Sequence, residues 1–154
     1  MPAPIPTLEH VCDLTVSAGA VAVPGETGAG LRRVIPIAGG SFAGPLLNGR
    51  VVGVGADWQT VRPDGVVELD ARYLLETDDG ALIELQDRGL RHGPPEVMAR
   101  LAAGEPVAAD EYTMRSAIRL VTGDDRYRWL DATVFVGAGA RTADGVAISI
   151  HAVR

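Results

Sequence analysis

The stretch VVELDARYLLETDDGALIELQD, residues 66–87, decides the fold. Apolar residues alternate with polar or charged ones on both sides of Asp79-Gly80, and this period of two is typical of β-strands. The Asp-Gly pair favours a tight hairpin turn, because glycine adopts positive φ without steric cost. We therefore expect strands over Val66–Thr77 and Ala81–Asp87 that pair as an antiparallel hairpin.

Further turn signals divide the rest of the chain into short segments with strand patterns. Leu8–Val16 alternates, and the dipeptides Gly39-Gly40 and Asn48-Gly49 predict turns between short strands. Tyr112–Val121 and Trp129–Val136 alternate in the same way and predict another hairpin. The chain is therefore expected to be a succession of strands.

One segment departs from this pattern. Residues 94–104, PPEVMARLAAG, combine two prolines that can open a first helical turn, helix-favouring Ala and Leu, and a closing glycine. Strands that recur about every ten residues with tight turns indicate a closed antiparallel barrel or a sandwich. We expect a closed antiparallel β-barrel, lipocalin-like in shape and with one short helix, as a single domain over residues 1–154.

Composition and charge narrow the classes of function. The chain is 47% hydrophobic and 22% charged, as globular proteins are, and its net charge is -6. Such a chain lacks the clustered cations that hold a phosphate backbone, so we expect no nucleic-acid partner. All 14 cationic residues are arginines, which excludes a Schiff-base lysine and most pyridoxal phosphate chemistry.

The sequence gives no sign of a membrane segment, a disulfide or a metal site. The start, MPAPIPTLEHVCDL, has neither a basic beginning nor a long apolar run, so we expect no membrane association and a cytoplasmic location. Cys12 is the only cysteine, and a buried, inert thiol is expected. His10, His92 and His151 never approach metal-ligand spacing, so we expect no metal and no other cofactor.

Each predicted strand has one apolar face and one mixed face, because alternate side chains share a face. The mixed faces carry Glu68, Asp70, Arg72, Leu74, Glu84, Arg115, Arg119, Trp129, Asp131 and Phe135. They could lie in water, where cross-strand ion pairs contribute little. Alternatively they line a polar lumen, and the helix, loops or another subunit cover the apolar faces. Trp129 and Leu74 among the charges favour the lumen hypothesis, as do acids and arginines that can neutralise one another.

Several motifs resemble a known family. They are R-x-I-P-I-x-G-G-x-F-x-G-P at Arg33–Pro45, G-A-D-W-Q at Gly55–Gln59, L-D-A-R-Y at Leu69–Tyr73, D-G-A-x-I at Asp79–Ile83, Y-R-W-L-D at Tyr127–Asp131 and F-V-G-x-G at Phe135–Gly139. Together they resemble the domain-of-unknown-function family 3237 over nearly the whole chain. The resemblance implies a compact, single-domain antiparallel β-barrel that is often oligomeric. Where that family tends to have Asn after the W-L pair, this chain has Asp131.

The resemblance and the mixed faces together supply candidate site residues. Positions that match the family's patterned residues are Asp57, Trp58, Asp70, Arg72, Tyr73, Arg115 and Trp129. We expect catalytic roles for Asp57, Asp70, Arg72, Glu84 and Arg115, and substrate binding by Trp58, Tyr73, Trp129 and Asp131. Structural roles remain open: Trp58 and Tyr73 could be core aromatics, and Asp57 could accept bonds from backbone N–H groups in a turn.

These residue types favour proton transfer. A carboxylate desolvated in a lumen has a raised pKa, and an arginine can hold a carboxylate or stabilise an enolate. We expect a cofactor-independent lyase, isomerase, dehydratase or cyclase that acts on a small organic substrate in the barrel. The alternatives are a non-catalytic small-molecule binding protein with the same lumen and a purely structural subunit. Uncovered apolar faces also predict a homo-oligomer, a dimer or higher.

Overall fold

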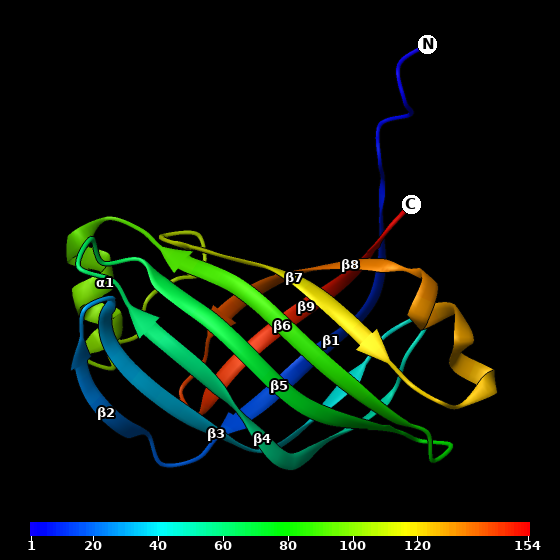
Figure 1. Ribbon diagram of the computed structural model, residues 1–154, viewed down its shortest axis with the longest axis horizontal. Coiled ribbons are helices and arrows are strands. Elements are labelled where there is room, and N and C mark those ends of the chain that lie inside the picture. Colours follow the sequence, from blue (N-terminus) through cyan, green and yellow to red (C-terminus); the bar gives the residue numbers. More distant parts are fainter.

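Nine antiparallel strands form one sheet that closes into a barrel in the computed structural model, which describes residues 1–154 (Figure 1). The strands are β1 Leu8–Ala18, β2 Ala22–Thr27, β3 Gly30–Ala43, β4 Gly49–Val61, β5 Val67–Thr77, β6 Leu82–His92, β7 Thr113–Val121, β8 Val134–Arg141 and β9 Gly145–Val153. Their order is β1-β9-β8-β7-β6-β5-β4-β3-β2, and β1 also pairs with β3. Eight strands therefore close the ring, and β2 is an extra strand on β3. The expected barrel is confirmed.

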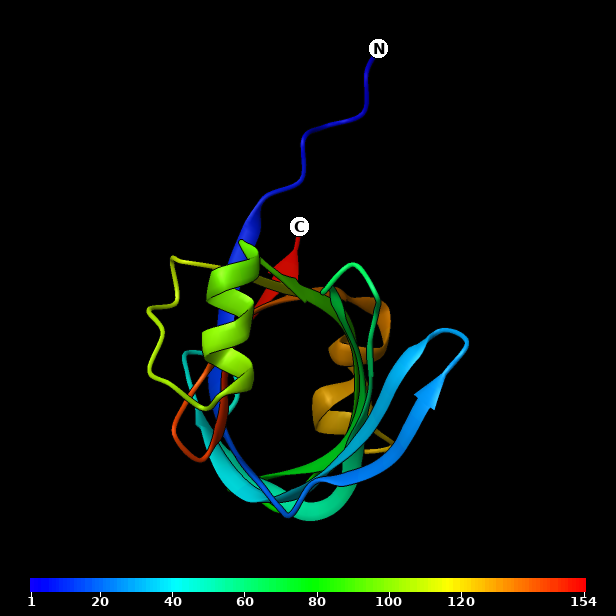
Figure 2. The ribbon, with the colours of Figure 1, turned by 90° about the vertical axis from the view of Figure 1, so that its left-hand side faces the viewer.

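Two helical segments mark the two ends of the barrel (Figure 1). The helix α1, Pro95–Ala102, joins β6 to β7 and matches the expected helix over residues 94–104. A 3-10 helix, η1 Asp125–Ala132, joins β7 to β8 at the opposite end. Figure 2 looks along the barrel with α1 toward the viewer and η1 behind it. No helix of the chain combines the length and the hydropathy needed to cross a membrane.

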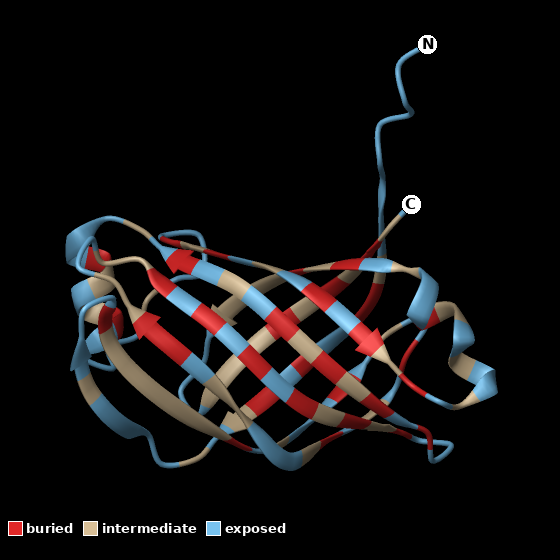
Figure 3. Cartoon of the chain, in the orientation of Figure 1, coloured by how far each residue is buried: buried red, intermediate tan, exposed pale blue.

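The apolar faces of the strands point into the barrel. Burial alternates along β5 and β6, as the stripes of Figure 3 show. Tyr73 and Leu75 on β5 and Ile83 and Leu85 on β6 belong to one large apolar cluster in the interior. The hypothesis that the mixed faces line the lumen is therefore wrong for β5, β6 and β7, whereas on β8 Phe135 of the predicted mixed face points inward and Val134 outward. The reason is energetic, because a barrel of this size fills its interior with side chains, and apolar side chains gain most from burial.

This arrangement also removes the reason given for self-association. The apolar faces that seemed to need a partner subunit are the core of the monomer. A homo-oligomer stays a prediction, and it now depends on the outer surface instead. There Trp58 is 50% exposed, and Val54 and Leu90 are exposed as well.

Three local expectations differ from the structure. Gly39-Gly40 is not a turn but a bend within the long strand β3, where both residues have positive φ. A Cβ on Gly40 would lie 2.0 Å from the carbonyl oxygen of Thr15, so only glycine fits where β3 crosses to pair with β1. The turn at Asn48 is longer than two residues, and the Asn48 amide bonds both the N–H and the C=O of Gly44.

The third difference concerns residues 129–132 of the predicted strand Trp129–Val136, which are helical rather than extended. Leu130 of η1 is buried in the large apolar cluster, and Trp129 packs against Phe135 with ring centroids 6.1 Å apart. The segment thus folds across the barrel end and covers it. Packing against this end outweighs the alternation that predicted a strand.

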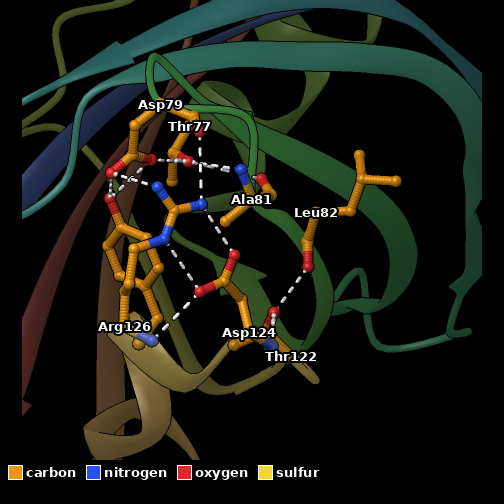
Figure 4. A network of polar contacts seen from close by, with 8 residues as sticks. Thr77, Asp79, Ala81, Leu82, Thr122, Asp124 and Arg126 are labelled. Atoms are coloured by element: carbon orange, nitrogen blue, oxygen red, sulfur yellow. Dashed lines mark hydrogen bonds and ion pairs between the residues drawn. The ribbon is translucent and has the colours of Figure 1, made fainter.

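Polar contacts hold η1 to the neighbouring turns (Figure 4). Arg126 pairs with Asp124 at 2.7 Å and with Asp79 of the β5–β6 turn at 3.2 Å. The Tyr127 hydroxyl donates to Asp79 at 2.9 Å, and the Thr122 hydroxyl donates to the carbonyl of Leu82 at 2.7 Å. The η1 end is therefore packed with apolar side chains inside and tied together by polar contacts outside.

Candidate functional site

A cavity of about 440 Å³ lies at the other end of the barrel, near the end of β1 and the β8–β9 turn. One part of its wall is apolar and consists of Val16, Ile35, Ile37, Met114 and Val146. The other part is polar and consists of Arg33, Asp57, Gln59, Arg91 and Arg141, with Asp144 at the rim. The volume and the mixture of many apolar groups with a few polar ones are those of small-molecule sites, which occupy about 300–1,000 Å³.

A chain of hydrogen bonds connects three polar side chains of the wall. Arg33 on β3 donates to the Oε1 of Gln59 at 2.7 Å, and Gln59 donates to the Oδ2 of Asp57 at 2.7 Å. Arg33 and Gln59 are direct cross-strand partners, and Asp57 lies two residues before Gln59 on the same face of β4. The strand pairing therefore fixes the distance between the guanidinium group and the carboxylate.

Asp57 also interrupts the pairing of β4 with β5. Asp57 and Thr60 of β4 have ladder partners on β5, but Trp58 and Gln59 between them have none. The second carboxylate oxygen of Asp57 accepts the backbone N–H of Asp70 at 2.9 Å. Burial raises the pKa of Asp57, whereas the bonds from Gln59 and Asp70 and the charge of Arg91 oppose that rise. Asp57 is therefore a carboxylate whose proton affinity exceeds that of an exposed aspartate.

A second carboxylate lies deeper in the barrel. Asp87 on β6 is 7% exposed, and one of its oxygens has no hydrogen-bond partner. Burial raises its pKa to about 6, and the nearby charge of Asp57 adds to the effect, while a contact with Ser116 opposes it. Tyr73 lies close by with a buried, unpartnered hydroxyl, and burial together with Asp87 and Asp57 raises its pKa.

The three arginines of the cavity have no carboxylate partner. None of Arg33, Arg91 and Arg141 forms an ion pair within 4.0 Å, although eight other arginines of the chain do. Arg91 is only 4% exposed, and its Nε has no partner, nor does the Nε of Arg33. Burial, together with the charges of Arg141 and Arg33, lowers the pKa of Arg91 to about 10. The site thus holds more positive charge than it neutralises.

Only two of the residues expected from the sequence lie inside the barrel, namely Asp57 and Tyr73. Asp70, Arg72, Glu84 and Arg115 point outward, so their expected place in a lumen site is corrected. Asp70 pairs with Arg88 at 3.3 Å and Arg72 with Glu84 at 3.2 Å, as exposed cross-strand ion pairs. These pairs match the hypothesis of mixed faces in water.

The expected aromatic and Asp131 contacts with a substrate also need correction. Trp58 lies on the outer face of β4, because Asp57 and Gln59 on either side of it point inward. Trp129 and Asp131 belong to η1, at the end opposite the cavity. Asp131 accepts the backbone N–H of Thr122 at 3.3 Å and so joins η1 to the end of β7. Neither of them lies among the residues that line the cavity.

The sequence reasoning missed the polar residues Arg33, Gln59, Asp87, Arg91 and Arg141. Asp87 and Arg91 could have been found, because they continue the apolar face of β6 that begins with Ile83 and Leu85. A charged residue in phase with an apolar face indicates a buried ionisable group. Arg33 lies inside the first family motif, but nothing local indicates that it meets Gln59. No three His, Cys, Asp or Glu side chains are grouped so as to hold a metal ion.

The fold and the site define a class: a small, closed antiparallel barrel with one packed end and an ionisable cavity near the other. The family model described as "Protein of unknown function (DUF3237)" matches residues 6–153. The chain belongs to this family, as the motifs around Arg33 and Asp57 indicated.

Relatives with high coverage share the fold. A "UPF0311 protein" of Rhodopseudomonas palustris is 43% identical over 150 residues, which cover 96% of this chain and 98% of the relative. A crystal structure of a conserved protein of unknown function from the same species superposes with a TM-score of 0.95, at 41% identity, over 99% of this chain and 100% of that one. A "beta-barrel like protein" from Acinetobacter baumannii gives 0.87, at 41% identity, over 99% of both chains.

One more distant relative has a named activity. The "Hydroalkoxylation enzyme phnH" of Penicillium herquei is 34% identical over 78 residues, which cover 51% of this chain and 52% of that protein. A solved enzyme structure from the same fungus superposes with a TM-score of 0.75 at 23% identity, over 100% of this chain and 98% of that one. At that identity, the structural likeness establishes a common fold.

Proposed function

We propose that this protein is a cofactor-independent enzyme that moves a proton on a small organic substrate bound in the cavity at the α1 end. Asp57 is the general base in this proposal. The observation that carries it is a carboxylate in the cavity wall whose pKa is raised by burial and which lies near unpaired arginines. A base of raised pKa accepts protons more readily, while arginines can stabilise the negative charge that a departing proton leaves behind.

The hydrogen bonds of Asp57 suit this role. Gln59 and the backbone of Asp70 each bond one carboxylate oxygen, which fixes the orientation of the group. Each oxygen keeps a further lone pair that can take a proton. Gln59 in turn accepts a hydrogen bond from Arg33, so the pairing of β3 with β4 fixes the position of Asp57. Such fixed positioning is a large part of what an enzyme contributes to a proton transfer.

The reaction can be written with this chain's own groups. In an isomerisation, Asp57 takes a proton from a C–H of the substrate, and the C–H electron pair moves onto a conjugated oxygen near the arginines. In a ring closure, Asp57 takes the proton of an alcohol O–H, whose electron pair forms the new C–O bond while the π pair of the carbon–carbon double bond moves onto the conjugated oxygen. The neutral Asp57 then returns the proton to another atom, so that the substrate gains and loses nothing overall. An isomerisation, or a ring closure in which an alcohol adds across a carbon–carbon double bond, has this balance. The name of the Penicillium relative, a hydroalkoxylation enzyme, supports the second version.

The test measures proton exchange, because it needs no knowledge of the natural substrate. The protein is incubated in D₂O with a panel of small enolisable ketones, acyl phenols and unsaturated alcohols, and loss of C–H signals is followed by NMR. We expect the wild-type chain to accelerate exchange or cyclisation of at least one compound. Asp57→Asn should abolish the acceleration, because an amide cannot accept the proton.

Asp70→Asn is the matched control, since Asp70 is the neighbouring carboxylate but points outward. It should retain the acceleration, although the pKa of Asp57 is lower without the charge of Asp70. If Asp57→Asn retains the acceleration, Asp57 is not the base. If the compounds bind but none exchanges faster than in buffer, the protein is a non-catalytic binding protein.

A further inference from the structure

The cavity arginines differ from the other arginines of this chain. Eight arginines form ion pairs on the surface, namely Arg50, Arg62, Arg72, Arg88, Arg100, Arg126, Arg128 and Arg154. Arg33 and Arg91 lie in a cavity wall and have none, although the chain contains more acidic than basic residues. Arg32, Arg115 and Arg119 outside the cavity also form no ion pair, but only Arg33 and Arg91 have a buried Nε without a hydrogen-bond partner.

A buried guanidinium group without a partner is costly. Arg91 is 96% buried, given its exposed fraction of 4%, and its Nε donor bonds nothing, while the Nε of Arg33 is likewise buried and unpaired. A buried charge is tolerated in proteins when it is paired and its donors are satisfied. The two side chains and Arg141 also repel one another, as the lowered pKa of Arg91 indicates. An anion in the cavity would relieve both penalties.

The carboxylates of the site offset this charge only in part, because the charge of Asp57 acts on Arg91 without a direct ion pair. Asp57 uses its oxygens on Gln59 and the backbone of Asp70, and burial disfavours its charged form. Asp87 does not line the cavity, and burial keeps it largely neutral below about pH 6. Asp144 lies exposed at the rim and forms no ion pair with an arginine. The excess positive charge therefore remains available to a bound molecule.

The apolar part of the cavity wall shows what the rest of that molecule is like. Val16, Ile37 and Met114 are buried apolar residues of this wall, and Ile35 and Val146 extend it. An inorganic anion would leave this wall against water, whereas an organic anion would cover it. Burying apolar area contributes about 25 cal/mol per Å², so an apolar body adds affinity that phosphate lacks.

We propose that the substrate is a small organic carboxylate whose carboxylate group binds Arg91 and Arg33 and whose apolar body lies against Val16, Ile37 and Met114. This inference rests on the proposed function, because it names the substrate class of the same site. Guanidinium groups match carboxylates in geometry and can donate two parallel hydrogen bonds. Arg141 is exposed at the mouth, where its charge attracts the anion.

The test compares the binding of carboxylates with that of their uncharged primary amides. Isothermal titration calorimetry measures binding of benzoate, 4-phenylbutyrate and 2-naphthoate, each against its primary amide, with inorganic phosphate as a further probe. We expect at least one carboxylate to bind at least about tenfold more tightly than its amide, because only the charged form meets the unpaired guanidinium groups. Phosphate should bind more weakly than that carboxylate.

Substitutions of three arginines show which guanidinium groups produce the preference for carboxylate over amide. Arg91→Met keeps an unbranched apolar stem without the charge and should remove the preference for carboxylate over amide. Arg88→Met, three positions earlier on β6 but outward and exposed, should leave it unchanged. Because Arg91→Met changes a buried group, Arg141→Met at the exposed rim is tested as well. It should weaken carboxylate binding severalfold in a chain whose unfolding transition is unchanged.

The outcomes separate this inference from the proposed function. Asp57→Asn should bind the carboxylate as tightly as the wild type or more tightly, since a negative charge is lost, while proton exchange disappears. Carboxylate binding without any exchange would overturn the proposed function and leave the substrate class standing. Equal binding of amide and carboxylate, tighter binding of phosphate, or no Kd below about 1 mM in the series would overturn the substrate class.

Discussion

Asp57 and Asp87 lie on one inward-facing row of the barrel with only Ala71 between them. Asp57 pairs across the ladder with Ala71, and Ala71 pairs with Asp87. The small side chain of Ala71 leaves the two carboxyl groups within electrostatic reach, and the charge of Asp57 raises the pKa of Asp87. Burial is the larger cause of the raised pKa of Asp87, and the charge of Asp57 adds to it.

The buried carboxyl of Asp87 gives the fold a pH dependence of known sign. Its pKa of about 6 in the folded chain lies above the ordinary value of 3.8, so folding favours the neutral form. That contribution is fully present below the unfolded pKa and is lost as the pH rises through about 6. Asp87→Asn has no ionisable group at this position and lacks this pH dependence. As the pH rises from about 4 to about 8, the free energy of unfolding of the wild type should therefore fall by about 3 kcal/mol relative to that of the variant.

Urea denaturation at a series of pH values measures this difference. Asp70→Asn, on the outer face of the neighbouring strand, serves as the control for removing one acidic group. A difference between wild type and Asp87→Asn that shrinks with rising pH would show that the charged form is favoured inside the barrel. The rise in the pKa of Asp87 should also be smaller in Asp57→Asn, since part of that rise comes from the charge of Asp57.

Tyr73→Phe distinguishes a core aromatic from a substrate-binding one. The hydroxyl of Tyr73 is buried and has no hydrogen-bond partner, and the ring belongs to the apolar core. Removing a buried, unsatisfied hydroxyl should raise the free energy of unfolding by about 1 kcal/mol, because its desolvation is no longer required. Thermal and urea unfolding check this. A loss of proton exchange in a fully folded Tyr73→Phe chain would instead assign the hydroxyl to the reaction.

Cys12 should be inert toward thiol reagents in the folded state. Burial raises its pKa to about 12, and the thiolate is the reactive form. We expect labelling by 5,5′-dithiobis(2-nitrobenzoic acid) to begin only when urea unfolds the chain, with a midpoint equal to that from circular dichroism. Fast labelling under native conditions would mean that β1 opens locally.

Self-association, if it occurs, should involve the outer face around Trp58. Trp58, Val54 and Leu74 line a shallow hollow on β4 and β5, and Trp58 is half-exposed. Aromatic residues are enriched at the centres of protein interfaces. Light scattering should therefore report an oligomer for the wild type and a smaller species for Trp58→Asp. A wild-type monomer at micromolar concentration contradicts the prediction.

The hairpin at residues 66–87 shows what a sequence can and cannot predict here. Its alternation correctly indicated two strands and a barrel, because strand periodicity is a local property. It could not decide which face lies inside, since a mixed outer face in water and a polar lumen have the same pattern. The position of Asp87 and Arg91 on the apolar face was the local clue that ionisable groups are buried.

The rest of the site depends on contacts between distant residues. Arg33 meets Gln59 because β3 and β4 pair in one particular register, which the separate segments do not reveal. Likewise, Arg91 and Arg141 approach each other because β7 pairs with both β6 and β8. Residues 129–132 belong to the segment that alternates like a strand but fold as part of η1, because Leu130 and Trp129 gain more by covering the barrel end.

The closure of the barrel by β1 also determines when the cavity can exist during synthesis. Val16 on β1 and Val146 on β9 are direct ladder partners, and both line the cavity. The wall is therefore incomplete until the last strand has left the ribosome and paired with the first. Contacts this far apart in sequence form late in folding. A shortened or still-growing chain should thus be unable to bind its ligand, so that the ligand stabilises only finished molecules.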